Sequence, residues 1–313
     1  MTLNSQRNRF LHDKLKWAIN IKKIKVPYLR TLFNLLELPS PFAELQSTRR
    51  NLEFLKSEFG GNVITKKVIR RSKKSNTLFI LGSGSSINKL TKKQFDFISQ
   101  NDSIATLSMI KHEFIADFYS IEVITQENRE QDVLQEEIIS KLITKDQYYK
   151  KSFFIIRPKV SSIRSSLNLQ ELIIAKFNGV WDFPKSIISI SKFEFKTTLK
   201  LLDKFRIFSS DKSFLDFNST IIWCIFLAIK LQYRHIVLCG IDLEGPYFYE
   251  ESANKMMNRN IHSSLKKSYK NKFDLLESIE IINNTLLKKK GIRLYTDLGS
   301  KKLTKFLPIY EYI

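Results

Sequence analysis

Short apolar runs that alternate with helical patterns are the feature of this sequence that most restricts its fold. The run Thr77–Leu81 ends at the turn Gly82–Ser86, and the run His235–Cys239 ends at Gly240-Ile-Asp242. Runs of this length bounded by turn residues are typical of buried strands. Strands that alternate with helices predict an α/β fold with a Rossmann-like, doubly wound and mostly parallel sheet. The other expected strands are 102–107, 117–121, 153–156 and 292–295, and the expected helices are 91–98, 129–143, 221–231 and 273–289.

The chain is expected to divide into a basic N-terminal helical extension, residues 1–75, and a Rossmann-like domain, residues 76–313. The extension interleaves lysines with apolar residues at helical spacing, and prolines at 39 and 41 interrupt the pattern. Residues 159–215 show no clear periodicity apart from a candidate strand at 187–190. One large domain with an added segment fits a length of 313 residues.

The chain carries a net charge of +21, from 52 Lys and Arg against 31 Asp and Glu. Residues 1–75 hold 17 of these basic residues against 5 acidic ones, and residues 255–305 hold 13 against 4, so the central part is nearly neutral. Such an excess predicts an anionic partner. For the extension, which includes Trp17, two interpretations stay open: a basic amphipathic helix on an anionic membrane, or an arm packed on the core.

The cysteine count and the hydropathy pattern indicate the compartment. Cys224 and Cys239 both lie in apolar runs, so neither a disulfide framework nor a cysteine-based zinc site is expected. No stretch of about 18 apolar residues appears, and the N-terminal residues lack the pattern of a signal peptide. We expect a cytoplasmic protein, and the membrane interpretation of residues 1–75 would place it peripherally at the inner membrane.

Polar groups follow two of the expected strands, where a parallel sheet binds its ligands. The turn Gly82–Ser86 offers amides and hydroxyls at the start of a helix, which suits a phosphate, but a tight structural turn explains it equally well. Asp242 either faces the ligand crevice or caps a neighbouring loop. Asp242 and Glu244 are too weak a pair to predict a metal site. Tyr247 and Tyr249 could donate hydrogen bonds to a phosphate where cations are few, or simply pack the loop.

Four histidines are available as a general base near neutral pH. His12 lies in the basic extension, and His235 begins a strand at the end away from the crevice. His112 and His262 are therefore the candidates, although on composition alone a solvated loop histidine is the simpler interpretation of His262.

The order of these motifs resembles the bacterial CMP-sialic acid transferases of glycosyltransferase family 42. The best-matching block runs from Ser219 to Asp242, where the family shows a Thr-Ser-Gly turn, an apolar helix, an apolar strand and Gly-Ile-Asp. The turn Gly82–Ser86 is similar to the family's first nucleotide loop, His262-Ser263 to its His-Ser, and 290–295 to its closing strand. The likeness spans roughly residues 76–298, and 123–215 match poorly.

The resemblance implies a metal-independent, inverting transferase that moves sialic acid or a related ulosonic acid, such as Kdo or legionaminic acid, from CMP to a cell-surface glycan in lipopolysaccharide or capsule synthesis. It implies an oligosaccharide or glycolipid acceptor and no cofactor besides the CMP-activated donor. The oligomeric state stays open, and a homo-oligomer is one of the alternatives. His262 would deprotonate the acceptor, and Tyr247 or Tyr249 would bind the leaving phosphate. The implied substrate-binding residues are Gly82, Ser83, Gly84, Ser85, Ser86, Ser219, Thr220, Gly240 and Asp242.

Several positions depart from the family pattern. Family asparagines are replaced by Ser83 or Ser85, by Ser108 and by Ser120; an arginine falls at Phe217 with Asn218 beside it; and a tyrosine is replaced by Glu244. Glu122, after the third strand, is either an acceptor-binding or base residue or a surface carboxylate. These changes leave the identity of the sugar open.

Two other function classes remain at this stage. A nucleic-acid-binding protein would explain the charge and the aromatic residues, but the charge lies outside the α/β part and no recognised nucleic-acid motif appears. Another nucleotide-using Rossmann-like enzyme, such as a methyltransferase or a pterin diphosphokinase, would explain the glycine-rich turn.

Overall fold

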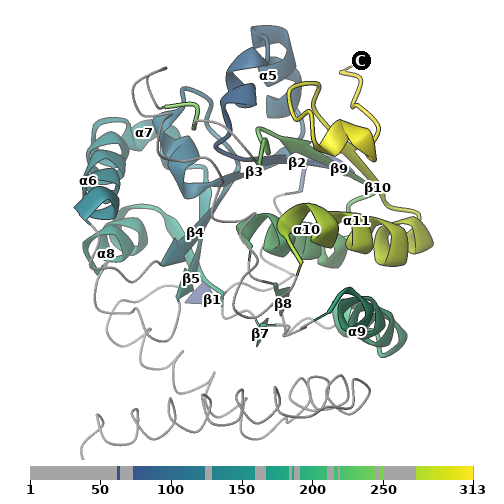
Figure 1. Ribbon diagram of the computed structural model, residues 1–313. Coiled ribbons are helices and arrows are strands. Elements are labelled where there is room, and N and C mark those ends of the chain that lie inside the picture. The colour runs from purple at the N-terminus through teal and green to yellow at the C-terminus, as the bar shows by residue number, and fades with distance from the viewer. Residues whose placement is uncertain are drawn as a thin grey trace, which may run out of the picture.

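The protein, as a computed structural model, forms a parallel sheet covered by helices on both faces (Figure 1). This confirms the predicted Rossmann-like α/β class. The structure describes residues 62–63, 73–123, 129–158, 167–182, 185–186, 191–209, 215–217, 219–243, 247–249 and 273–312.

The sheet has eight strands in the order β1-β6-β5-β4-β3-β2-β9-β10, and all the pairs are parallel. From β2 the chain moves outward strand by strand to β6, then returns to place β9 on the other side of β2. The switch point of this doubly wound sheet therefore lies between β2 and β9. The strands are β1 (Asn62–Val63), β2 (Thr77–Leu81), β3 (Asp102–Thr106), β4 (Phe118–Val123), β5 (Phe153–Pro158), β6 (Asn178–Trp181), β9 (His235–Cys239) and β10 (Arg293–Thr296); β7 (Lys185–Ser186) and β8 (Leu215–Asp216) form a separate parallel pair.

Two groups of helices bury the two faces of the sheet. Side chains alternate between the faces along each strand, so Leu78 and Ile80 join one core while Phe79 and Leu81 join the other. In Figure 1 α10 and α11 lie below the sheet and α5 lies above it. One core contains α9 (Lys192–Lys204), α10 (Thr220–Lys230) and α11 (Leu275–Ile282); the other contains residues of α5 (Lys92–Ser99), α6 (Arg129–Thr144), α7 (Asp146–Tyr149) and α8 (Leu167–Lys176).

The strongest sequence patterns are confirmed. Strands β2 and β9 have the predicted bounds, because each is an apolar run that ends at a glycine. Helix α5 begins after Thr91, whose hydroxyl accepts the amide of Gln94 while the Gln94 side chain accepts the Thr91 amide. The predicted helices at 129–143 and 221–231 are α6 and α10, within one residue at each end.

Two regions differ from the expectation. Within 159–215 the described residues form α8, β6, β7, α9 and β8, which the irregular pattern did not predict, and 187–190 lies outside the described residues. The expected helix at 273–289 is α11 followed by a π-helical turn, Asn283–Leu287, and a 3₁₀ turn, Lys288–Lys290.

Part of the predicted N-terminal extension belongs to the sheet. Asn62 and Val63 pair with Val180 and Trp181 of β6 as the edge strand β1. The other described residues of that segment, at 73–75, lead directly into β2.

The described residues contain no helix long and apolar enough to cross a membrane. Cys224 and Cys239 are both buried and unpaired.

Candidate functional site

Two glycine-containing loops meet at the switch point, one after β2 and one after β9. The amide of Gly82 donates to the carbonyl oxygen of Cys239, and the amide of Gly84 donates to that of Gly240, both at 2.8 Å. A Cβ atom on Gly82 would lie 2.5 Å from the Gly240 oxygen. Gly240 also has a φ of +65°, a left-handed conformation that glycine adopts without strain. The glycines therefore allow the two loops to approach each other.

The carboxylate of Asp242 fastens these loops together. Its Oδ2 accepts the amide of Ser86 at 2.8 Å and the hydroxyl of Ser85 at 3.4 Å, and its Oδ1 accepts the hydroxyl of Ser86. A hydrogen bond to a charged group contributes roughly 1.5–3 kcal/mol. Of the two roles left open by the sequence, capping of a neighbouring loop is the one that these contacts display.

A third loop, which the sequence did not suggest, supports the other two from beyond β10. Asp297 is buried and accepts the amide of Gly240 at 3.0 Å and that of Ser300 at 2.9 Å. Burial raises the pKa of Asp297 above its ordinary value, and the hydrogen bonds from Ser300 and Gly240 oppose that rise. A Cβ atom on Gly299 would lie 2.4 Å from the Cβ of Ser86. In the sequence, the signal for this loop was Asp297 directly after the last strand, followed by Gly299.

These contacts limit which groups of the Gly82–Ser86 turn can reach a ligand. The amides of Gly82, Gly84 and Ser86 all donate to other loops of the protein. Ser83 and Ser85 are only half-buried, whereas Ser86 is buried. The turn is therefore poorly suited to cradle a phosphate with successive amides, and Ser83 and Ser85 are its partly accessible hydroxyl residues.

Tyr247 and Tyr249 lie beside this turn. Tyr247 forms an antiparallel bridge with Gly84, and the amide of Phe248 donates to the Ser83 carbonyl oxygen at 3.0 Å. The two tyrosine rings stack with centroids 5.3 Å apart. The Nζ atom of Lys111 lies 4.2 Å from the centroid of the Tyr249 ring. A cation therefore lies at this edge of the site, where it also pairs with the Glu137 carboxylate, and Lys111 is a residue that the sequence analysis missed.

His112 lies at the edge of the same loop. Its ring contacts Phe95 and Phe248, with centroids 5.1 and 5.4 Å away. Its Nδ1 accepts the amide of Phe114 at 3.0 Å. Burial lowers the pKa of His112 below its ordinary value, so a neutral imidazole is favoured. His112 packs among aromatic rings, which suits a structural role.

The predicted polar residues on and after β3 and β4 differ in how far they are buried. Ser108 follows β3, and its hydroxyl lies 3.4 Å from that of Thr106. Ser120 sits opposite Thr106 in the middle of β4, buried, with no hydrogen-bond partner for its hydroxyl within the described residues. Glu122 lies further along β4, opposite Arg157 of β5.

A buried polar network connects β5 and β6 with the start of α10. Arg157 donates from Nη2 to the Thr220 hydroxyl at 2.7 Å, and its guanidinium lies 4.6 Å from the centroid of the Trp223 ring. The Trp223 indole donates to Oδ2 of Asp182 at 2.8 Å. Arg157 and Asp182 are 3% and 2% exposed, so both ionisable groups are held inside the protein. The sequence analysis missed both residues, although each stands at the end of a strand.

The start of α10 lies at the same edge of the sheet as the loops, because the helix runs antiparallel to β9. Ser219 caps the helix by accepting the amide of Ile221 at 3.2 Å. The positive end of the helix dipole and the guanidinium of Arg157 converge near Thr220. This end of the site favours an anion. Asn218, Glu244 and His262, three other predicted site residues, lie outside the described residues.

The fold is similar to the crystal structure of the monofunctional alpha-2,3-sialyltransferase Cst-I from Campylobacter jejuni. The two chains are 17% identical, the TM-score is 0.43, and the match covers 80% of this chain and 83% of that chain. No protein-family model and no curated protein matches this chain.

Asp182 gives the buried network a pH dependence that can be measured. Burial raises its pKa to about 7, against the opposing effects of the Trp223 hydrogen bond and the Arg157 charge. The folded protein therefore binds this proton more tightly than the unfolded chain, so the Asp182 contribution to the free energy of unfolding should fall between about pH 4 and pH 7. As pH rises through this range, the contribution should fall by about 1.4 kcal/mol per pH unit, and above pH 7 it should stay constant. Asp182→Asn should lack this dependence.

Urea unfolding at a series of pH values tests this dependence. The wild-type protein, Asp182→Asn and the exposed control Asp96→Asn would be compared. If Asp182→Asn kept the wild-type slope while its fold was unchanged, the assignment of the proton to Asp182 would be wrong.

Proposed function

We propose that this protein is a glycosyltransferase that transfers a sugar from a CMP donor to a glycan. The observation that carries the proposal is the pair of loops at the switch point, fastened by the bonds from Ser85 and Ser86 to Asp242. Doubly wound sheets bind nucleotides at this point. The half-buried Ser83 and Ser85 suit the hydroxyl and amide groups of a nucleoside.

We propose sialic acid or a related ulosonic acid, such as Kdo or legionaminic acid, as the transferred sugar. The motif resemblance over Ser219–Asp242 supports this donor class. Ulosonic acids carry a carboxylate on the anomeric carbon, and an anion is favoured where the start of α10 meets Arg157. Thr220, which accepts the Arg157 hydrogen bond, is the proposed contact to that carboxylate.

The proposed chemistry is a single displacement with inversion. The acceptor hydroxyl attacks the anomeric carbon and gives its proton to His262, while the bond from that carbon to the CMP phosphate oxygen breaks. CMP leaves as an anion, which hydrogen bonds and nearby positive charge stabilise. Tyr247 and Tyr249 would donate to the phosphate, and Lys111, which lies over Tyr249, would supply charge. No metal is assigned a role in this scheme.

The acceptor is proposed to be an oligosaccharide or a glycolipid, with residues 1–75 as the contact to an anionic membrane. The basic and apolar residues that interleave before Pro27 support this contact. An enzyme with a membrane-bound acceptor gains from such a contact, because it raises the local concentration of the acceptor.

CMP should stabilise the protein against thermal unfolding, whereas S-adenosylmethionine and ATP should not. At a hundred times its dissociation constant, a ligand of the folded state adds about 2.7 kcal/mol to the free energy of unfolding. Ser85→Ala should weaken the CMP effect, and the exposed control Ser140→Ala should not. Stabilisation by S-adenosylmethionine or ATP but not by CMP would point to another class of nucleotide enzyme.

His262→Ala should retain CMP binding and lose transfer. Removal of a general base typically lowers the rate by about 10²–10⁴-fold. The matched variant His112→Gln should keep most of the activity, because His112 packs among aromatic rings. Transfer to a labelled acceptor and thermal shift with CMP measure the two effects. Loss of transfer in His112→Gln, with full activity in His262→Ala, would move the base to His112.

Replacement of lysines 14, 16, 22 and 23 by glutamine in the full-length protein should weaken binding to vesicles that contain phosphatidylglycerol. Each lysine near an anionic surface contributes roughly 1 kcal/mol. Co-sedimentation measures the effect, with phosphatidylcholine vesicles as the baseline. Unchanged binding would contradict the proposed membrane contact of residues 1–75.

A further inference from the structure

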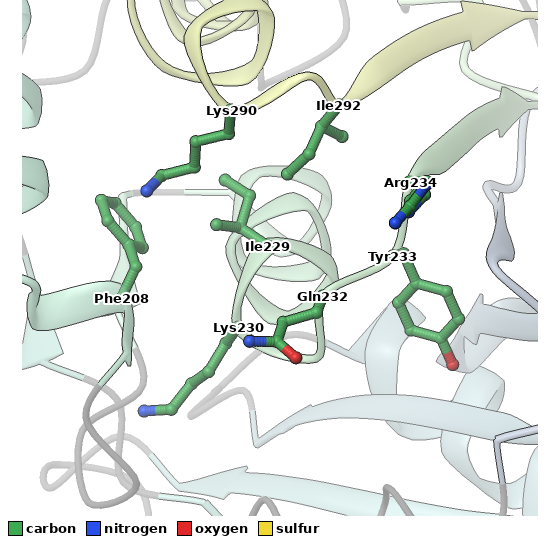
Figure 2. Close-up of a pocket in the computed structure, with 8 residues that line it drawn as sticks. All are labelled: Phe208, Ile229, Lys230, Gln232, Tyr233, Arg234, Lys290 and Ile292. Atoms are coloured by element: carbon green, nitrogen blue, oxygen red, sulfur yellow. The ribbon is translucent and has the colours of Figure 1, made fainter.

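A pocket lies at the opposite end of the sheet from the loops. It forms where α10 ends, where β9 and β10 begin, and where the 3₁₀ turn Lys288–Lys290 precedes β10. Its volume is about 330 Å³. The pocket is lined by Phe208, Ile229, Lys230, Gln232, Tyr233, Arg234, Lys290 and Ile292 (Figure 2).

The lining combines an apolar wall with basic side chains. Ile229, Ile292 and Phe208 are buried hydrophobic residues. Figure 2 shows the two isoleucines between Lys290 on one side and Arg234 on the other. The pocket therefore offers both a surface for an apolar group and positive charge for an anion.

Positive charge at this end is incompletely neutralised by the protein. Within the described part of the chain, the guanidinium groups of Arg234 and Arg293 have no ion pair or hydrogen bond. A single carboxylate, that of Asp203, pairs with both Lys289 and Lys290. The pKa of His235 reflects the same excess of positive charge. Burial is the largest cause that lowers this pKa below its ordinary value, and the charges of Arg293 and Arg234 lower it further.

The C-terminal end of α10 repels an anion less than an uncapped helix end would. The carbonyl of Ala228 accepts the amide of Tyr233, and that of Ile229 accepts the amide of Gln232, both at 3.1 Å. Gln232 adopts the left-handed conformation of this capping motif, with φ 62°, and its own carbonyl accepts from Lys73 Nζ at 3.3 Å. The last helix carbonyls are thus largely satisfied, which reduces the negative potential that they present to the pocket.

We propose that this pocket binds a phosphate group carried by an apolar molecule. Arg234 would hold the phosphate, since a guanidinium matches phosphate oxygens with two parallel donors, and Lys290, which pairs with Asp203, would add positive charge on the other side of the apolar wall. Ile229, Ile292 and Phe208 would contact the apolar substituent. A phospholipid headgroup and a soluble aryl or alkyl phosphate share this chemistry. The proposal is independent of the glycosyltransferase proposal, because it concerns the other end of the sheet.

The test uses the full-length protein and charge-matched variants. Arg234→Ala with Lys290→Ala removes two cations from the pocket, and Lys196→Ala with Lys200→Ala removes two exposed cations of α9 that do not line it. The single variant Arg234→Ala guards against misfolding, because the exposed Arg234 side chain has no partner to lose within the described residues. Phenyl phosphate is the soluble probe, and vesicles of phosphatidylcholine with and without phosphatidic acid are the membrane probe.

Phenyl phosphate should raise the midpoint of thermal unfolding of the wild-type protein and of the α9 control. The pocket variants should need at least tenfold more of it for the same rise. If binding to phosphatidic acid vesicles also falls in the pocket variants but not in the control, the source of the phosphate is a lipid. If only the phenyl phosphate effect falls, the source is soluble. Equal behaviour of pocket and control variants with both probes would overturn the proposal.

Discussion

The contact between the loops after β2 and β9 is the constraint on which the candidate site depends. Two adjacent parallel strands end side by side, and their chains then leave toward opposite wings of the sheet. Glycines at 82 and 240 let the two backbones approach to hydrogen-bonding distance, and Asp242 fixes the result through Ser86. Asp297 in turn holds the amide of Gly240. Hydrogen bonds therefore join the three loops, and the half-buried Ser83 and Ser85 lie on the loop at their centre.

Much of the fold could be predicted because the central strands are buried on both faces. Such strands must be apolar throughout, so β2 and β9 stand out as runs, and each ends where a glycine stops it. The strands of the far wing give weaker signals: β6 is the four-residue sequence Asn-Gly-Val-Trp, and β1 has two residues. Helix α9 did carry a signal, since Ser191 precedes Glu194 by three residues and Phe195, Leu199 and Leu202 follow at helical spacing.

The meeting of the two loops was predictable from the sequence, but its atomic detail was not. The sequence places the Gly82–Ser86 turn and Asp242 at the carboxyl ends of strands, and a doubly wound topology brings them together. It does not reveal that the amides of Gly82, Gly84 and Ser86 are used between loops, because those partners lie far away in the chain. For the same reason the pairing of Arg157 with Thr220 was missed. A lone arginine before a proline carries no local pattern, and its partner Thr220 comes near it only in the folded protein.

Charged side chains are arranged differently at the two ends of the sheet. This difference restricts which anionic partners the net charge of +21 indicates. At the carboxyl end, Arg157 lies over Trp223 near the buried Asp182, and Lys111 pairs with Glu137, so charges are held in defined positions. Groups fixed in this way cost little further ordering when a small substrate arrives. At the amino end, the exposed Arg234 lies beside the apolar wall of the pocket, and neither it nor the exposed Arg293 has a side-chain partner in the described residues. Unpaired exposed cations of this kind are stabilised when an external anion supplies the missing charge. The proposed substrate site therefore involves charges that are already ordered, whereas the proposed phosphate pocket involves an exposed arginine without a partner in the described residues.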